Sequence, residues 1–230
     1  IGYNSIGTGV TTGEMNVAMG VSSLAAITSG NCNVAIGRSA GGALTTGCHN
    51  VGIGGGAIGT GTTTGNSNVA VGVNSVSAVG TGACNVGVGD SALNAVTSGC
   101  RNVAVGKNAL GIAVVVGHDN IALGSNSADA ITSGACNIAL GTNALGASTT
   151  GCENIALGNA ALGAGILIGH ENIAFGSAAG DALTSGSCNL AIGQNALGAA
   201  TDACFNIAIG HAAMSGGVVT DGTGSQGRHN

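Results

Sequence analysis

One five-residue phrase, which reads Asn-Ile-Ala-Leu-Gly at residues 154–158, returns along almost the whole chain. Its first residue recurs twelve times, in steps of 17, 17 and 18 residues that repeat as a triplet, at Asn16, Asn33, Asn50, Asn68, Asn85, Asn102, Asn120, Asn137, Asn154, Asn172, Asn189 and Asn206. A fixed short period is typical of repeat proteins, in which each unit buries its apolar surface only against its neighbours. The chain is therefore expected to form a stack of similar units.

Each phrase has the pattern of a short β-strand that ends at a corner. Its second and fourth residues are usually aliphatic, which puts two apolar side chains on one face of a strand and a small residue on the other. The fifth residue is glycine in all twelve copies, as expected where the chain turns through dihedral angles that other residues avoid. With one later aliphatic residue, each coil is expected to bury about three aliphatic side chains. The pattern predicts an all-β fold, a β-solenoid (parallel β-helix or β-roll) of about 13 coils with 17-17-18 residue repeats.

Composition and charge argue against other classes of protein. The 230 residues include 46 glycines, no proline, no tryptophan and only 6% charged residues, which is far from globular usage. Disorder does not fit a chain that is 44% hydrophobic with a regular apolar period. The net charge of −5 offers no basic surface for nucleic acid. No apolar run approaches the roughly 20 residues of a membrane span, so no membrane insertion is expected.

The repeats run without a linker, so residues 1–217 are interpreted as one continuous solenoid domain. Residues 218–230 contain an irregular polar insertion and then Gly-Arg-His-Asn, which resembles the lead-in to Asn50 and indicates the start of a further repeat. Both ends fall in mid-repeat, and the sequence is expected to be a piece of something longer.

Eight cysteines form four pairs in consecutive coils. The first member of each pair lies one residue before a repeat asparagine and the second lies two before the next, which separates them by 16 residues. A rung spacing of about 4.8 Å and a one-residue offset of about 3.3 Å give a Cα separation of roughly 5.8 Å, within disulfide range. The predicted bridges are Cys32–Cys48, Cys84–Cys100, Cys136–Cys152 and Cys188–Cys204. Bridges between chains and reduced thiols are the alternatives, and bridges of either kind favour an oxidising, extracellular location.

The repeat asparagines are interpreted as structural. Aligned in successive rungs, their amides can hydrogen-bond to one another along the stack as a ladder. The acidic residues are scattered over corner positions and form no catalytic pair by spacing, and the cysteines lack a C-x-x-C motif or a regular partner histidine. We therefore expect no enzyme activity, no cofactor and no metal site.

Two apolar triplets interrupt the long coils, Val114-Val115-Val116 and Ile166-Leu167-Ile168, and Val218-Val219 lies near the corresponding place in a third. Neighbouring residues of a strand point to opposite sides, so at least one member of each triplet is expected to face outward. A hydrophobic stripe that packs on another chain is the prediction, and a locally doubled core is the alternative.

The phrase Asn-Ile-Ala-Leu-Gly-x-x-Ala-Leu-Gly, with Thr-Thr-Gly or Thr-Ser-Gly before the next asparagine, resembles the repeats of phage and virus tail-fibre proteins. More distantly, it is similar to the head repeats of trimeric autotransporter adhesins. The resemblance covers about residues 1–217 and implies an extended, often trimeric shaft on a virion or cell surface, used for attachment.

These observations predict an extracellular structural protein that forms a rod or filament of stacked β-coils. Its expected partner is itself, as a homo-oligomer or an end-to-end polymer, with any cell-surface receptor bound through parts outside this chain. The shaft of a trimeric tail fibre or surface adhesin is one alternative. An ice-binding solenoid is another, suggested by threonine pairs such as Thr45-Thr46 and Thr149-Thr150.

Overall fold

The computed structural model describes residues 2–7, 11–59 and 61–216, in which there are twelve β-strands and no helix. The chain divides into two compact units, Ile1–Val116 and Gly117–Asn230. The fold is a parallel β-solenoid, as predicted, with about 11 turns where the sequence indicated about 13 coils. The smaller count follows because residues 2–7 hold no strand and residues 218–230, with Val218 and Val219, lie outside the described part.

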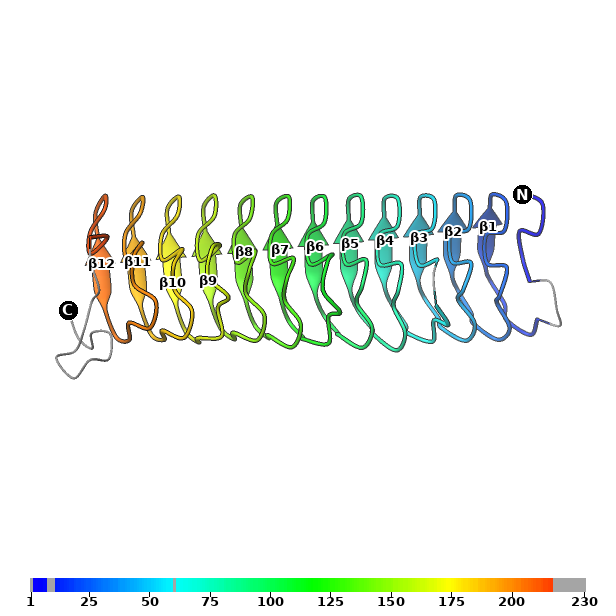
Figure 1. Ribbon diagram of the computed structural model, residues 1–230. Helices are drawn as coiled ribbons and strands as arrows, with labels where there is room; N and C mark the ends of the chain where they lie inside the picture. Colours follow the sequence, from blue (N-terminus) through cyan, green and yellow to red (C-terminus); the bar gives the residue numbers. More distant parts are fainter. Residues whose placement is uncertain (1, 8–10, 60, 217–230) are drawn as a thin grey trace. The chain divides into compact units, whose positions relative to one another are not determined.

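Every strand has three residues and coincides with the middle of one repeat phrase. The first unit contains β1 (Val17–Met19), β2 (Val34–Ile36), β3 (Val51–Ile53), β4 (Val69–Val71), β5 (Val86–Val88) and β6 (Val103–Val105). The second contains β7 (Ile121–Leu123), β8 (Ile138–Leu140), β9 (Ile155–Leu157), β10 (Ile173–Phe175), β11 (Leu190–Ile192) and β12 (Ile207–Ile209). Within each unit, every strand pairs in parallel with the next in sequence order (Figure 1).

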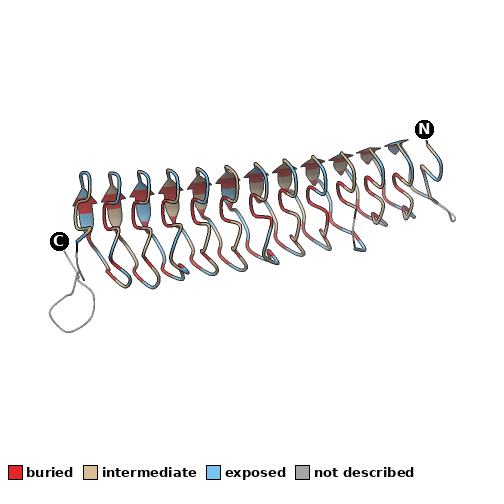
Figure 2. Cartoon of the chain, turned by 45° about the horizontal axis from the view of Figure 1, so that its top comes forward, coloured by how far each residue is buried: buried red, intermediate tan, exposed pale blue. Residues whose placement is uncertain are grey.

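The strands face the opposite way from the one expected. Their central residue, alanine or glycine, is buried, while the apolar residues on either side of it are exposed or half-buried (Figure 2). The cause is the narrow interior opposite the strand. A Cβ added at Gly87 would lie 2.6 Å from Cγ2 of Val76, so the inward position of the strand accepts only very small residues.

The core is instead built by the turn that follows each strand. Leu93 and Leu110 of the first unit and Leu145, Leu162 and Leu197 of the second all lie eight residues after a repeat asparagine and are fully buried. A second inward row includes Ile27, Val79, Ile131 and Leu183. Each coil therefore buries one or two large aliphatic side chains, and the other large ones are left on the outside.

The glycine at the end of each phrase is required by both backbone conformation and stacking. Gly141 has a φ of 134°, a region closed to other residues. A Cβ at this position would approach the carbonyl oxygen of Gly158, in the next coil, to 2.5 Å. The corner glycines thus stack directly on one another, and a side chain at this position would not fit between neighbouring coils.

Candidate interaction surface

The outward residues of the strands form a continuous apolar surface on each unit. We call the strand face the first and third residues of every strand, which are Val, Ile, Leu, Met or Phe throughout. Met19 is 51% exposed, Phe175 is 56% exposed and Ile209 is 64% exposed. The parallel register aligns similar apolar residues of successive coils, as in Val34 against Val51 and Ile36 against Ile53. Each unit therefore presents two parallel rows of six hydrophobic side chains.

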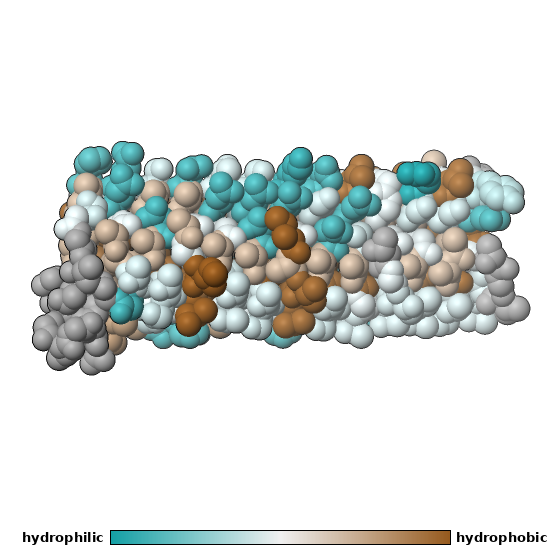
Figure 3. All heavy atoms as spheres, in the orientation of Figure 1, coloured by the Kyte–Doolittle hydropathy of each residue, from teal (hydrophilic) through white to brown (hydrophobic). Residues whose placement is uncertain are grey.

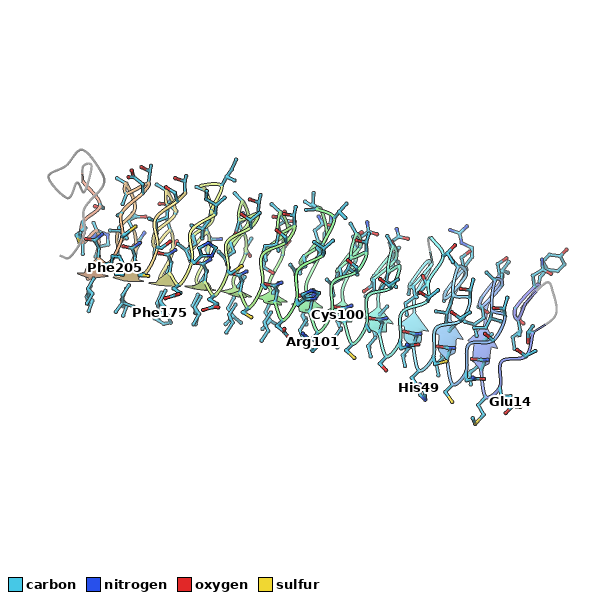
Figure 4. All side chains as sticks on the ribbon, turned by 90° about the horizontal axis from the view of Figure 1, so that it is seen from below. Glu14, His49, Cys100, Arg101, Phe175 and Phe205 are labelled. Carbon is cyan, nitrogen blue, oxygen red and sulfur yellow. The ribbon has the colours of Figure 1, made fainter. Side chains whose placement is uncertain are left out.

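A column of varied residues borders this face. The flanking column consists of the residue immediately before each repeat asparagine: Met15, Cys32, His49, Ser67, Cys84 and Arg101 in the first unit, and Asp119, Cys136, Glu153, Glu171, Cys188 and Phe205 in the second. All twelve have a φ between 55° and 60°, the left-handed region, and all are exposed or half-buried. Figure 4 shows His49, Arg101 and Phe205 along the edge of the ribbon that carries the strands. Phe175 of the strand face lies along the same edge.

The two units differ in charge. The basic residues Arg38, Arg101 and Lys107 all lie in the first unit. The first unit also contains two acidic residues, Glu14 and Asp90. Residues 117–216 of the second unit contain no lysine or arginine and six carboxylates, at Asp119, Asp129, Glu153, Glu171, Asp181 and Asp202. Glu153 and Glu171 belong to the flanking column. The second unit therefore has an acidic border along its apolar face, which the first unit lacks.

All eight cysteines are free thiols in this structure, and the four predicted bridges stay a prediction. The backbone contacts the second thiol of a pair. Sγ of Cys48 accepts a hydrogen bond from the amide of Asn31 at 3.3 Å and donates one to the carbonyl oxygen of Thr46 at 3.5 Å. Cys152 repeats this arrangement with Ala135 and Thr150. The first cysteine of each pair has a left-handed backbone, which the extended-chain estimate of their separation did not include.

The thiol of Cys188 has a raised pKa and a carboxylate partner. Burial raises its pKa, and the neighbouring carboxylate of Glu171 and the thiol of Cys204 raise it further. Its Sγ lies 3.7 Å from Oε2 of Glu171 and donates a hydrogen bond to it. Because the thiolate is the reactive form, Cys188 is placed to be a poor nucleophile.

The predicted asparagine ladder is present in both units. Within each unit, the Oδ1 atom of every ladder asparagine except the last accepts hydrogen bonds from the backbone N–H and the side-chain Nδ2 of the asparagine in the next coil. Asn50 donates to Asn33 in this way at 2.9 and 3.1 Å, and Asn154 donates to Asn137 at 3.0 and 3.2 Å. In most coils Nδ2 also donates to the glycine carbonyl three residues before the next asparagine, as Asn33 does to Gly47 at 2.9 Å. The ladder amides are thus structural, with their hydrogen-bonding capacity used inside the stack.

The apolar triplets alternate as the strand geometry requires. Val115 and Leu167 are fully buried, whereas Val114, Val116, Ile166 and Ile168 are exposed. Figure 3 shows hydrophobic patches separated by paler surface on the face that it draws. The exposed members recur only once in every three coils. They form small patches, unlike the strand face, which is apolar in every coil.

Other polar features of the surface are modest. A shallow groove of about 400 Å³ in the second unit is lined by Asp129, Asn143, Ala160 and small residues of the same turns. Burial raises the pKa of Asp129, and backbone N–H groups partly offset this. Threonine hydroxyls are used within the stack, because Thr28 and Thr45 each donate to the carbonyl oxygen of the equivalent residue in the next coil.

The described residues contain no group of three or more His, Cys, Asp or Glu side chains arranged to hold a metal ion. In the same part of the chain there is no helix long and apolar enough to cross a membrane. No protein-family model, curated protein or solved structure matches this chain.

Proposed function

We propose that this chain is a structural, self-associating solenoid of an extracellular fibre, in which copies pack side by side through the strand face. It carries out no catalysis. The shaft of a trimeric tail fibre or surface adhesin is the three-chain form of this proposal, and any receptor is bound by parts outside the chain. The location outside the cell is proposed from the resemblance of the repeats to tail-fibre and adhesin repeats.

The outward aliphatic rows are the observation that carries the proposal. Soluble monomers rarely expose contiguous apolar patches of more than a few hundred Å². The twelve strand-face side chains of one unit expose on the order of 600 Å² if each leaves about a third of its surface in water. Two such faces would bury about 1,200 Å², the lower end of the range for stable interfaces. A second copy of the same chain supplies a face with matching size, rung spacing and chemistry.

The regular period of the strand face also favours a repeating partner. Its ridges recur with the rung spacing of about 4.8 Å, so a partner must present ridges with the same period in order to interdigitate over several coils. A globular partner would meet this requirement over only one or two rungs. A second solenoid meets it over the length of a unit.

Sedimentation velocity over a range of concentrations tests the proposal. The native chain is expected to sediment as a dimer or larger species. A variant with Val86→Glu, Val88→Glu, Ile138→Glu and Leu140→Glu should sediment as a folded monomer, because an interface would have to bury four carboxylates. A native chain that stays monomeric at high concentration would refute the proposal.

The apolar triplets provide the matched control. Changing Val114, Val116, Ile166 and Ile168 to glutamate adds the same charge at exposed aliphatic positions outside the strand face. This control should associate as the native chain does. If it becomes monomeric while the strand-face variant does not, the triplets form the interface and the strand face does not.

A further inference from the structure

We infer that the strand face of the first unit packs on the strand face of the second unit of another copy, with the two solenoid axes antiparallel. This inference rests on the proposed self-association and specifies its orientation and register. It is carried by the flanking column, whose residues differ between the two units in a complementary way.

The strand face alone cannot fix the register. Its residues are aliphatic in nearly every coil, so two copies could slide by one rung, about 4.8 Å, and make almost the same contacts. The flanking column changes from coil to coil and is therefore able to select one register. Consider two solenoids whose strand faces pack together with their long axes antiparallel. The strands of the two copies then run in the same direction, and the flanking column of one copy lies over the flanking column of the other.

The six coils of one unit then oppose the six coils of the other in reverse order. Coil two of the first unit carries Cys32 and meets coil five of the second, which carries Cys188. Coil five carries Cys84 and meets coil two, which carries Cys136. The third coil brings exposed His49 to exposed Glu171. All four cysteines of the flanking column oppose one another in this register.

The ends of the two columns match as well. Met15 of the first coil opposes Phe205 of the last, which places a thioether against an aromatic ring, a favourable contact. Arg101 of the sixth coil opposes Asp119 of the first coil of the second unit. No pair in this column has like charges. Packing the second unit on itself in the same way would place Glu153 opposite Glu171, two carboxylates beside an apolar interface, which is costly.

Cross-linking between defined cysteines tests the orientation. In one variant Cys32 and Cys188 are kept and the other six cysteines are changed to serine. Chains labelled with ¹⁴N and ¹⁵N are mixed and treated with a short bis-maleimide at mildly alkaline pH, because the raised pKa of the Cys188 thiol slows its reaction at neutral pH. The chains are then digested, and the linked peptides are identified by mass spectrometry. Mixed-isotope links between Cys32 and Cys188 should exceed links between identical residues by at least about tenfold. A variant that keeps only Cys84 and Cys136 should behave in the same way.

Cys48 and Cys204 form the matched control pair. They lie one residue further from the strands, in the third and sixth coils of their units, which do not oppose each other in the inferred register. A variant that keeps only these two should give no mixed-isotope link between them. Abundant links there, or links mainly between two copies of Cys32, would overturn the inference, the second result indicating a parallel bundle.

A charge swap provides an independent readout. His49→Glu should raise the dissociation constant about tenfold by facing Glu171 of the second copy, and His49→Glu with Glu171→Lys should restore it. If neither variant changes the dissociation constant, the register is wrong. Sedimentation distinguishes failure of the proposed self-association from failure of the inferred orientation. A monomeric native chain refutes self-association, whereas an associated chain without Cys32–Cys188 links refutes only the antiparallel pairing.

Discussion

Replacing one ladder asparagine, Asn137→Ala, is expected to destabilise the solenoid strongly. The Asn137 side chain is 1% exposed and makes four hydrogen bonds. Its Nδ2 donates to Oδ1 of Asn120 at 3.0 Å and to the carbonyl oxygen of Gly151 at 2.8 Å. Its Oδ1 accepts from the backbone N–H and Nδ2 of Asn154 at 3.0 and 3.2 Å.

The size of the effect follows from the groups that lose a partner. Oδ1 of Asn120 still accepts from the backbone amide of residue 137, and Nδ2 of Asn154 still donates to Gly169. The backbone N–H of Asn154 and the carbonyl of Gly151 lose the bonds that the side chain made. At about 1–3 kcal/mol for each buried group left unsatisfied, the free energy of unfolding should fall by roughly 2–6 kcal/mol.

Urea denaturation followed by far-ultraviolet circular dichroism is the suitable assay, because the chain contains one tyrosine and no tryptophan for fluorescence. Asn159→Ala, at an exposed position, is the control and should change stability by less than about 0.5 kcal/mol. A loss below about 1 kcal/mol for Asn137→Ala would refute the structural account of the ladder.

Three further predictions concern the corner, the acids and the thiols. Gly141→Ala should cost more than about 2 kcal/mol, because its φ is 134° and the new Cβ would meet the carbonyl of Gly158, whereas Gly55→Ala, with its nearest neighbour at 4.0 Å, should be nearly neutral in the same urea titration. Burial raises the pKa of Asp129 and Asp181, so the free energy of unfolding should fall as pH rises through their folded pKa values. The double variant Asp129→Asn with Asp181→Asn should show a smaller fall over the same pH range, and a pH profile equal to that of the native chain would contradict this prediction. Because its pKa is raised, Cys188 should be alkylated by iodoacetamide at neutral pH more slowly than Cys136, as followed by mass spectrometry. The substitution Glu171→Gln should speed the alkylation of Cys188, and equal rates in the native chain and this variant would argue against the contact between Cys188 and Glu171.

The sequence was sufficient to predict the architecture and the internal ladder. Repeat spacing located every strand, because the strand is the invariant part of the phrase, and the recurrence of asparagine in register allowed only a ladder or a ligand row. The corner glycines were predicted for the right reason as well. Gly124 and Gly141, for example, both have strongly positive φ.

The orientation of the strands could not be read from their alternation. A period of two separates the two faces of a strand but does not say which one is inside. The interior volume decides this, and it depends on the buried turn residues, such as Val76 opposite Gly87. Those residues adopt left-handed conformations that β-branched side chains rarely take, as Ile58 and Val76 do at φ values of 51° and 50°. The sequence signal that was available is the restriction of the inward strand position to alanine and glycine.

The cysteine pairs show the same limit. Their spacing in sequence gave a Cα separation compatible with a bridge, but a bridge also requires the two side chains to point at each other. The left-handed backbone of Cys32 and the backbone contacts of Cys48 also influence the directions of these side chains. Spacing therefore bears on proximity in the stack, and covalent pairing of these cysteines stays a prediction.

Cryo-electron microscopy of the protein as isolated tests the central claim most directly, by showing how many chains occupy a cross-section and which surface lies between them. The account predicts two or more solenoids in contact through the outward residues of their strands, with the aliphatic rows shielded from water. Single solenoids with the strand face in solvent, or bundles joined through the apolar triplets with the strand face exposed, would contradict it.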